Sequence, residues 1–435
     1  MLSESQERML VVVAKGMEAK ASAICAKWDV PFTLIGEVTD DGVITVSRHG
    51  NVVAQLPAAS LVLGGGAPVY VRGQQRPAYL EMTLSPIDHG PTLHENECTE
   101  LLERLLAQPT IASKRWIFEQ YDSQVMTNTV QRSGGDAAVI RIKEQPGKAV
   151  AVTTDCNSRY VYLNPYRGAM IAVAEAARNC ACVGAVPVGV TNCLNFGNPY
   201  DPEVYWQFAE AIRGMGDACR AFDTPVTGGN VSFHNESQNH AVFPTPTIGM
   251  LGVIDDVQQT VGAAFTAEHQ PVWMLGPQRS DLGGSEYLKM TKGVIRGDAP
   301  QFDLAEEVAL QKALIEGIRK GYVSAAHDCA EGGLLVALAE MTFARGVGAS
   351  VSIPFEHHAG HLFGEGQSRV VVEVHPEHVD AMRSLCASHG VPVTELGVTQ
   401  DSSLAVDGLV HRDVAALRSI YESALPTVLA REYHS

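Results

Sequence analysis

Thr227-Gly228-Gly229-Asn230-Val231-Ser232 is the stretch around which the rest of the sequence can be interpreted. Two adjacent glycines remove side-chain bulk and permit positive φ, so a ligand can approach the backbone N–H groups. Asn230 adds an amide that can coordinate a hard cation, and Ser232 adds a hydroxyl. Apolar residues flank the stretch, which predicts a turn between two short extended segments. An ordinary glycine turn without a ligand is the alternative.

Two more polar segments follow predicted strands. Val186 to Val190 is a predicted strand that leads into a loop containing Asn192 and Asn195, and a strand from Ala149 to Thr154 ends at Asp155. Ligands commonly bind where the strands of α/β proteins end, so these segments are expected to meet the glycine turn at one crevice. Asparagines are also common loop residues and Asp155 can be a turn or capping residue, so a purely structural role stays open for both.

His327-Asp328 is a candidate acid/base pair. Neighbouring residues usually point to different sides of the chain, so a histidine with local partners is the alternative that we favour. The sequence contains neither a GxxxxGK[ST] motif nor a GxGxxG motif at the start of a helix. Any nucleotide site is therefore of another kind.

The charge balance excludes some functions. The 435 residues carry 49 acidic and 32 basic side chains, a net charge of −17. This argues against a nucleic-acid or anionic-membrane surface, which needs basic patches.

Nine scattered cysteines without a CxxC motif favour free thiols in a reducing compartment. No run of 18 apolar residues is found in the sequence. We therefore expect a cytoplasmic protein.

A pattern of strand, helix and extended segment occurs twice, with an offset of 361 residues. The first copy reads as a strand at Met9 to Val13, a helix near Met17 to Trp28 and an extended segment at Val30 to Gly36. Identical residues keep this register throughout: Glu4/Glu365, Gln6/Gln367, Arg8/Arg369, Cys25/Cys386, Pro31/Pro392, Thr33/Thr394 and Gly36/Gly397. This predicts a duplicated β-α-β unit.

The two copies differ in what precedes them. Pro271 to Gly364 forms part of the second copy's own domain, whereas three residues precede the first copy. We therefore expect the sequence to begin inside a domain whose front half is absent. Gly64-Gly65-Gly66 marks a flexible exit from the first partial unit. Further helices are predicted from Glu95 to Leu106, from Gly168 to Ala181, from Asp201 to about Phe222 and from Asp303 onward.

Several passages together are specific for one family. They are Thr154-Asp155-Cys156-Asn157-Ser158-Arg159-Tyr160, Ala174-Glu175-Ala176-Ala177-Arg178-Asn179, Leu194-Asn195-Phe196-Gly197-Asn198-Pro199, Thr227 to Ser232 and Ala326-His327-Asp328. In this order they closely resemble phosphoribosylformylglycinamidine synthase, specifically the C-terminal portion of its small-type synthetase subunit. The resemblance covers essentially the whole sequence.

The resemblance implies an α/β (α+β) architecture, the aminoimidazole ribonucleotide synthetase-like ATP-binding fold, internally duplicated and with the first copy truncated at its N-terminus. It implies four parts. Residues 1–63 end a first C-terminal-type domain, 64–133 form a linker with a helical connection, 134–265 form the second N-terminal-type domain, and 266–435 form the second C-terminal-type domain.

The resemblance also implies an ATP-dependent carbon–nitrogen ligase of de novo purine biosynthesis. Formylglycinamide ribonucleotide, ATP and glutamine-derived ammonia would give the amidine, ADP and phosphate, with Mg²⁺ as the metal. ATP would phosphorylate the amide oxygen and ammonia would displace the phosphate, which requires positioning and charge neutralisation. The implied partners are a glutaminase subunit, a small accessory subunit and the missing N-terminal half.

Site residues follow from the matching motifs. Glu4, Ser5, Gln6 and Ser232 would contact the ribonucleotide, Asn192 and Gly229 would contact ATP, and Asn230 would bind Mg²⁺. Further candidates are Asp155, Asn195, Gly228, His327 and Asp328. Many relatives have aspartate at the position of Asn192, so a metal contact there would be weaker.

The catalytic histidines and further metal carboxylates of this family lie in the half that the sequence lacks, so no catalytic residue is assigned here. We expect the chain alone not to be a competent synthetase. A non-catalytic nucleotide-binding fragment of the same fold is the alternative function. A sister enzyme acting on selenide or thiamine phosphate is disfavoured by Leu194 to Pro199 and by Ser3-Glu4-Ser5-Gln6.

Overall fold

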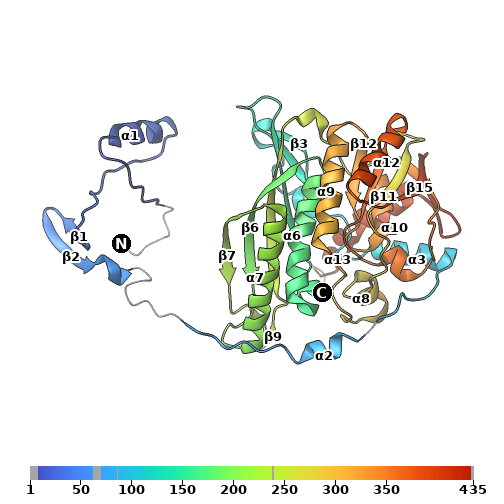
Figure 1. The fold of residues 1–435 in the computed structure, drawn as a ribbon, viewed down its shortest axis with the longest axis horizontal. Coiled ribbons are helices and arrows are strands. Elements are labelled where there is room, and N and C mark those ends of the chain that lie inside the picture. Colours follow the sequence, from blue (N-terminus) through green and yellow to red (C-terminus); the bar gives the residue numbers. More distant parts are fainter. Residues whose placement is uncertain (1–7, 62–69, 86, 238–239, 433–435) are drawn as a thin grey trace. The chain divides into compact units, whose positions relative to one another are not determined.

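The computed structural model describes residues 8–61, 70–85, 87–237 and 240–432. The chain divides into two compact units, Met1–Val71 and Arg72–Ser435, and each is described here by itself (Figure 1). In the described part of the chain, no helix has the length and apolar character needed to cross a membrane.

The first unit contains one α-helix and one hairpin among its described residues. They are α1 (Glu18–Lys27), β1 (Val43–Arg48) and β2 (Asn51–Pro57), followed by the 3₁₀ helix η1 (Ala58–Leu61). The expected helix is confirmed, but the expected strands at Met9 to Val13 and Val30 to Gly36 are wrong, since both segments are irregular. A helix satisfies its own backbone hydrogen bonds, whereas a strand needs a neighbour. The predicted exit at Gly64-Gly65-Gly66 lies outside the described residues.

Among its described residues, the second unit begins with four short or medium helices and contains two large sheets. The helices are α2 (Tyr79–Thr83), α3 (Glu95–Leu106), α4 (Arg115–Phe118) and η3 (Val125–Thr127). The first sheet has the order β3-β4-β5-β10-β6-β7, in which only β6 and β7 pair in parallel. Its strands are β3 (Thr129–Gln131), β4 (Ala138–Arg141), β5 (Ala149–Asp155), β6 (Val186–Asn195), β7 (Val226–Ser232) and β10 (Thr245–Ile254).

Helices cover one face of this first sheet. They are α5 (Ser158–Leu163), α6 (Pro165–Cys182) and α7 (Pro202–Phe222), and Figure 1 shows α6 and α7 running along the strands. The caps follow the sequence: Asp201 accepts a hydrogen bond from Glu203 N, and proline starts both α6 and α7. A small hairpin, β8 (Glu236–Ser237) and β9 (His240–Ala241), follows β7.

The structure corrects the prediction for the glycine stretch. Thr227 to Ser232 is not a turn but belongs to β7, and Thr191 to Asn195 is not a loop but the second half of β6. Neither Gly228 nor Gly229 has positive φ. The two stretches are extended because they pair with each other, Asn192 opposite Gly229 and Asn195 opposite Ser232.

The second sheet has the order β12-β14-β11-β15-β13-β16-β17. Its strands are β11 (Pro271–Leu275), β12 (Val323–Asp328), β13 (Gly348–Val351), β14 (Val370–Val374), β15 (Val393–Gln400), β16 (Ser403–Val406) and β17 (Val410–Asp413). The accompanying helices are η4 (Val257–Gln259), α8 (Glu286–Lys292), α9 (Leu304–Arg319), α10 (Gly333–Phe343), α11 (Ala359–Phe363), η5 (Pro376–His378), α12 (Val379–Ser388) and α13 (Val414–Glu432).

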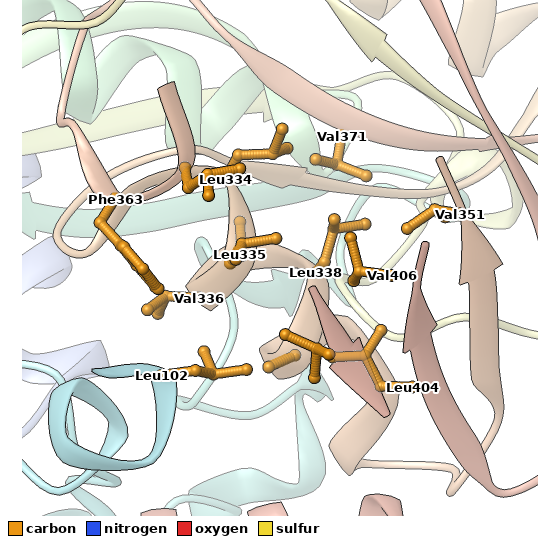
Figure 2. Close-up of a cluster of buried hydrophobic side chains, with 14 of the residues drawn as sticks. Leu102, Leu334, Leu335, Val336, Leu338, Val351, Phe363, Val371, Leu404 and Val406 are labelled. Atoms are coloured by element: carbon orange, nitrogen blue, oxygen red, sulfur yellow. The ribbon is translucent and has the colours of Figure 1, made fainter. Parts of the chain in front are cut away.

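Helix α10 forms the centre of the core of this second sheet. Nearly every residue of α10 is buried, as expected for a helix that is apolar all round. Figure 2 shows Leu334, Leu335 and Leu338 of α10 among side chains from the strands, such as Val371 and Leu404. The second copy of the repeat is complete here: β14, α12 and β15 form, because β14 lies between β11 and β12 and β15 pairs with β11.

Candidate functional site

Asn192 and Gly229 lie side by side on the helix-covered face of the first sheet. Asn192 Nδ2 is 3.5 Å from Met215 Sδ on α7, which fixes the face to which this side chain points. A Cβ placed on Gly229 would stand 2.1 Å from Asn192 Oδ1 and 2.6 Å from Asn192 O. Gly229 is therefore needed for close packing against Asn192, rather than for the positive φ of a turn.

Asn230 and Ser232 point to the opposite, open face of the sheet, because side chains alternate along a strand. Asn230 is exposed and Ser232 is half-buried. Cys193 and Asn195, their partners on β6, share this open face. The structure thus divides the predicted site: the two ATP candidates meet on one face, and the metal and ribonucleotide candidates meet on the other.

Gly229, Asn230 and Ser232 all lie on β7, which is the edge strand of the sheet. An edge strand pairs on one side only, so alternate backbone N–H and C=O groups point outward. Every residue of β7 before Ser232 is exposed to solvent, and Ser232 is half-buried. A ligand lying along this edge can use the outward backbone groups of Gly229 together with the side chains of Asn230 and Ser232.

Asn235 is a further candidate, in contact with Ser232, that the sequence reasoning missed. Its Nδ2 donates to Ser232 O at 2.8 Å and to Phe196 O at 3.1 Å, and its amide also contacts Ser232 Oγ. It therefore connects the ends of β6 and β7. The signal present in the sequence was an asparagine three residues after Ser232, a spacing at which an amide can turn back onto the strand end.

Two of the further candidates have roles within the sheet. Asn195 Nδ2 contacts Cys193 O of its own strand at 3.2 Å and Thr245 O of β10 at 3.5 Å, so its amide already has partners within the sheet. Gly228 faces open space, since a Cβ placed on it would meet no atom of the described residues within 4 Å. Neither residue shows by its geometry that it needs a ligand.

Asp155 lies at the end of β5, on the helix-covered face and in the same row of the sheet as Asn192. Asn179 Nδ2 donates to Asp155 Oδ1 at 3.0 Å, and Thr153 Oγ1 donates to Oδ2 at 3.1 Å. Burial and the nearby carboxylate of Asp328 raise the pKa of Asp155 to about 7.

Asp155, which is half-buried, belongs to a group of buried and half-buried acidic side chains between the two sheets. The group also contains Glu175, Asp328, Glu331 and Glu365. Burial, followed by the charge of Glu331, raises the pKa of Glu175 well above its usual range and that of Glu365 to about 7. The acidic residues outnumber the cations near them, so protons replace missing positive charge.

Arg178 of α6 is the central cation of this layer and is fully buried. It contacts three residues from the second sheet's domain: Asp328 Oδ2 at 3.2 Å, Glu307 Oε2 at 2.8 Å and Gln367 Oε1 at 2.8 Å. Despite the opposing effect of burial, these carboxylates raise its pKa further. Arg178 thus fixes α6 to α9 and to the ends of β12 and β14.

In the second copy of the repeat, the polar residues that match Glu4 and Gln6 form hydrogen bonds within the protein. Gln367, the counterpart of Gln6, accepts a hydrogen bond from Arg178. Glu365, the counterpart of Glu4, accepts hydrogen bonds from Tyr160 Oη, Glu286 N and Gly332 N. Both side chains are fully buried. In this copy, protein groups occupy the polar atoms that the first copy is expected to offer to the ribonucleotide.

His327 and Asp328 point to different partners, as expected for neighbours on a strand. His327 Nδ1 lies 3.0 Å from Asp136 Oδ2, and its Nε2 lies 3.2 Å from Glu340 Oε2. Burial alone would lower the pKa of His327, but the two carboxylates raise it well above the usual value. Local ion pairs therefore account for both residues, in agreement with the alternative that we favoured.

The described residues offer little preformed metal coordination near Asn230. Across the described part of the chain, the one group of three possible metal-ligand side chains is Asp136, His327 and Asp328, far along the chain from β7 and already paired. Asn230 fits Mg²⁺ as a single neutral oxygen ligand, since Mg²⁺ commonly takes most of its ligands from phosphates, waters and one or two carboxylates. Glu4, Ser5 and Gln6 lie outside the described residues.

Two family models match the sequence. The N-terminal domain of AIR synthase related proteins matches residues 134–254, which contain most of the first sheet. The C-terminal domain of the same family matches residues 1–49 and 267–407. One domain model thus matches both copies of the repeat.

Curated relatives are similar over almost the whole chain. Phosphoribosylformylglycinamidine synthase subunit PurL of Salinibacter ruber is 50% identical over 98% of this chain, and that of Chlorobium chlorochromatii is 49% identical over 91%. The subunit of Moorella thermoacetica is 44% identical over 99%. The chain spans 58%, 53% and 59% of the lengths of these three proteins.

Solved structures share the fold. Thermotoga maritima PurL complexed with ATP has a TM-score of 0.55 at 23% identity, covering 90% of this chain and 54% of that one. T. maritima PurL complexed with FGAR has a TM-score of 0.54 at 23% identity, covering 90% of this chain and 52% of that one.

Proposed function

The chain belongs to the AIR synthase related proteins and, within them, to the phosphoribosylformylglycinamidine synthase subunits PurL, and from this premise we propose that it forms one part of the synthetase site. The reaction is the ATP-dependent amidation of formylglycinamide ribonucleotide with ammonia derived from glutamine. The observation that carries this proposal is the 44–50% identity to PurL subunits along nearly the whole chain.

We assign the chain's share of the chemistry to the edge of the first sheet. The outward backbone N–H of Gly229 is offered to an ATP phosphate, and Asn192 packs against Gly229 from the helix side. Asn230 supplies one oxygen to Mg²⁺, which when bound neutralises phosphate charge. Ser232 offers its hydroxyl to the ribonucleotide. All four residues act by binding and orienting, which is most of what phosphoryl transfer asks of a protein.

Within this chain, Glu4, Ser5 and Gln6 are assigned to the ribonucleotide together with Ser232, and the other ligands come from outside the chain. Asn230 and Ser232 lie on the open face of the sheet, where exposed apolar side chains continue from them: Ile140, Val152, Val188 and Leu251 are 37–41% exposed. A sheet face with apolar side chains in a row is a surface for another protein layer. We assign this face to the N-terminal half of the synthetase, which would bring catalytic side chains over Asn230 and Ser232.

The wider assignments follow the same family. ATP and Mg²⁺ are the cofactors, a glutaminase subunit supplies ammonia, and a small accessory subunit is a further partner. T. maritima PurL has been solved with ATP, with ADP and with FGAR, which supports these ligands for the present chain. All nine cysteines are free thiols in the structure, which favours the reducing cytoplasm as the place of action.

The test is complementation. The chain is assayed for amidine formation with ammonia and Mg-ATP, first alone and then mixed with the N-terminal portion of the Salinibacter ruber PurL subunit that this chain does not span. We expect activity in the mixture and none with either part alone. A folded, associated mixture without activity would favour the non-catalytic alternative, a nucleotide-binding fragment of the same fold.

A further inference from the structure

The side chain of Asn235 reaches the hydroxyl of Ser232 as well as the backbone around it. Asn235 Nδ2 has three possible acceptors: Ser232 O at 2.8 Å, Phe196 O at 3.1 Å and Ser232 Oγ at 3.2 Å. Asn235 Oδ1 lies 3.3 Å from Ser232 Oγ. The amide and the hydroxyl are therefore in contact through both ends of the amide.

The number of hydrogens on the Asn235 amide decides which group donates in its contact with the Ser232 hydroxyl. An amide NH₂ has two hydrogens, and the two shorter contacts of Nδ2 are to backbone carbonyls, which can only accept. The contact that remains for the hydroxyl is Asn235 Oδ1, which also can only accept. The Ser232 O–H therefore donates inward to Asn235, and its lone pairs are left for a ligand.

The geometry points to Asn235 as a positioning residue that holds the Ser232 hydroxyl as a hydrogen-bond acceptor. This inference rests on the proposed function and makes it more specific. A phosphate monoester oxygen at neutral pH mostly accepts hydrogen bonds, so it is a poor partner for an acceptor. Ser232 therefore takes an O–H or N–H of the ribonucleotide, from the ribose or the amide side chain, rather than its phosphate.

Backbone hydrogen bonds, as well as the Asn235 amide, hold together the loops that follow β6 and β7. Phe196 N donates to Ser232 O, His234 N donates to Gly197 O, and Asn235 N donates to Phe196 O, at 3.0–3.1 Å. These backbone hydrogen bonds connect the ends of β6 and β7 without the side chain. A change of Asn235 is therefore expected to leave the fold in place and to release the hydroxyl.

The experiment measures affinity for formylglycinamide ribonucleotide by titration calorimetry on the chain mixed with the complementary N-terminal portion. Asn235→Ala and Ser232→Ala are each expected to weaken binding roughly tenfold, and the double variant no further, because the two changes remove one interaction. Binding of Mg-ADP should stay unchanged in Asn235→Ala. Asn198→Ala is the matched control: Asn198 Oδ1 accepts from Tyr200 N in the same loop.

Asn235→Asp separates positioning from loop support, because a carboxylate still accepts from Ser232 but no longer donates to the backbone carbonyls. Affinity within about threefold of the unchanged protein supports positioning. A loss as large as that of Asn235→Ala, or additive losses in the double variant, would overturn it. If the unchanged mixture binds no ribonucleotide, the proposed function itself fails, and this inference with it.

Discussion

Gly229 of β7 lies directly against the side-chain amide of Asn192 of β6, so closely that a Cβ on Gly229 would stand 2.1 Å from Asn192 Oδ1. Its neighbour Gly228 faces open space. Two adjacent glycines in the same strand therefore have different reasons for being there, and they make a matched pair for experiment.

Gly229→Ala is expected to lower the free energy of unfolding by about 1–3 kcal/mol, because overpacking forces Asn192 or the strand to move. Gly228→Ala should change it by less than about 1 kcal/mol, since its φ suits alanine and no atom of the described residues is close. Urea unfolding of both variants measures this. Equal losses would show that the close contact with Asn192 does not determine the need for glycine.

Arg178→Ala is expected to destabilise the second unit by about 3–5 kcal/mol, because the change leaves Glu307, Asp328 and Gln367 buried without their donor. The control is Arg220→Ala, since Arg220 is 73% exposed and pairs with Asp217 on the surface. Its loss should stay within about 1 kcal/mol. Thermal unfolding of both variants measures these losses. Similar shifts in melting temperature for the two variants would contradict a central role for Arg178.

Asp155 should make the protein progressively less stable as pH rises from about 4 to about 7. Its pKa is raised to about 7 in the folded chain, from an ordinary value of 3.8 for aspartate. The folded state thus binds more protons than the unfolded state between these values, so this contribution to stability is present at low pH and lost as pH rises through about 7.

The measurement for Asp155 is the urea midpoint at pH 5 and pH 8 for the unchanged chain and for Asp155→Asn. The variant should lose less stability between the two pH values, because the amide does not ionise. Asp407→Asn, at an exposed turn, is the control and should follow the unchanged chain. Parallel pH curves for Asp155→Asn would rule out this source of pH dependence.

Leu251 should matter for association rather than for stability. It is 41% exposed on the open face of the first sheet, so Leu251→Asn should weaken binding of the complementary N-terminal portion at least about tenfold. Val398→Asn is the matched control, since Val398 is 42% exposed on β15 of the other sheet. Sedimentation or calorimetry gives both affinities. Unchanged association in Leu251→Asn would place the partner on another face.

Much of the fold could be predicted because its signals are local. The caps at Asp201 and Asp303 and the apolar periodicity gave α7 and α9, and the repeat gave β14, α12 and β15. The strand predictions for the first copy were wrong, because this pattern forms strands only where neighbouring strands are present to pair with it. The glycine stretch failed for a related reason, because pairing with β6 outweighs the turn preference of Gly and Asn.

The candidate site residues follow from the motifs and stay predictions, but the face to which each side chain points does not follow from the motifs. The motifs identified Asn192, Gly229, Asn230 and Ser232, yet only strand register shows that Asn192 and Asn230 point to opposite sides. Asn235 escaped because its role depends on a contact with Phe196 from another strand end. The ion pairs of Arg178 with Glu307 and of His327 with Asp136 likewise join residues more than 120 positions apart.

The central claim is that this chain supplies one part of a shared synthetase site. Amidine formation from formylglycinamide ribonucleotide, ammonia and Mg-ATP tests it most directly, with the chain alone, with the complementary N-terminal portion, and with both when the chain carries Ser232→Ala. The account predicts activity only when both parts are present, and a reduced rate with Ser232→Ala. Turnover by the chain alone, or full turnover by the mixture with Ser232→Ala, would contradict it.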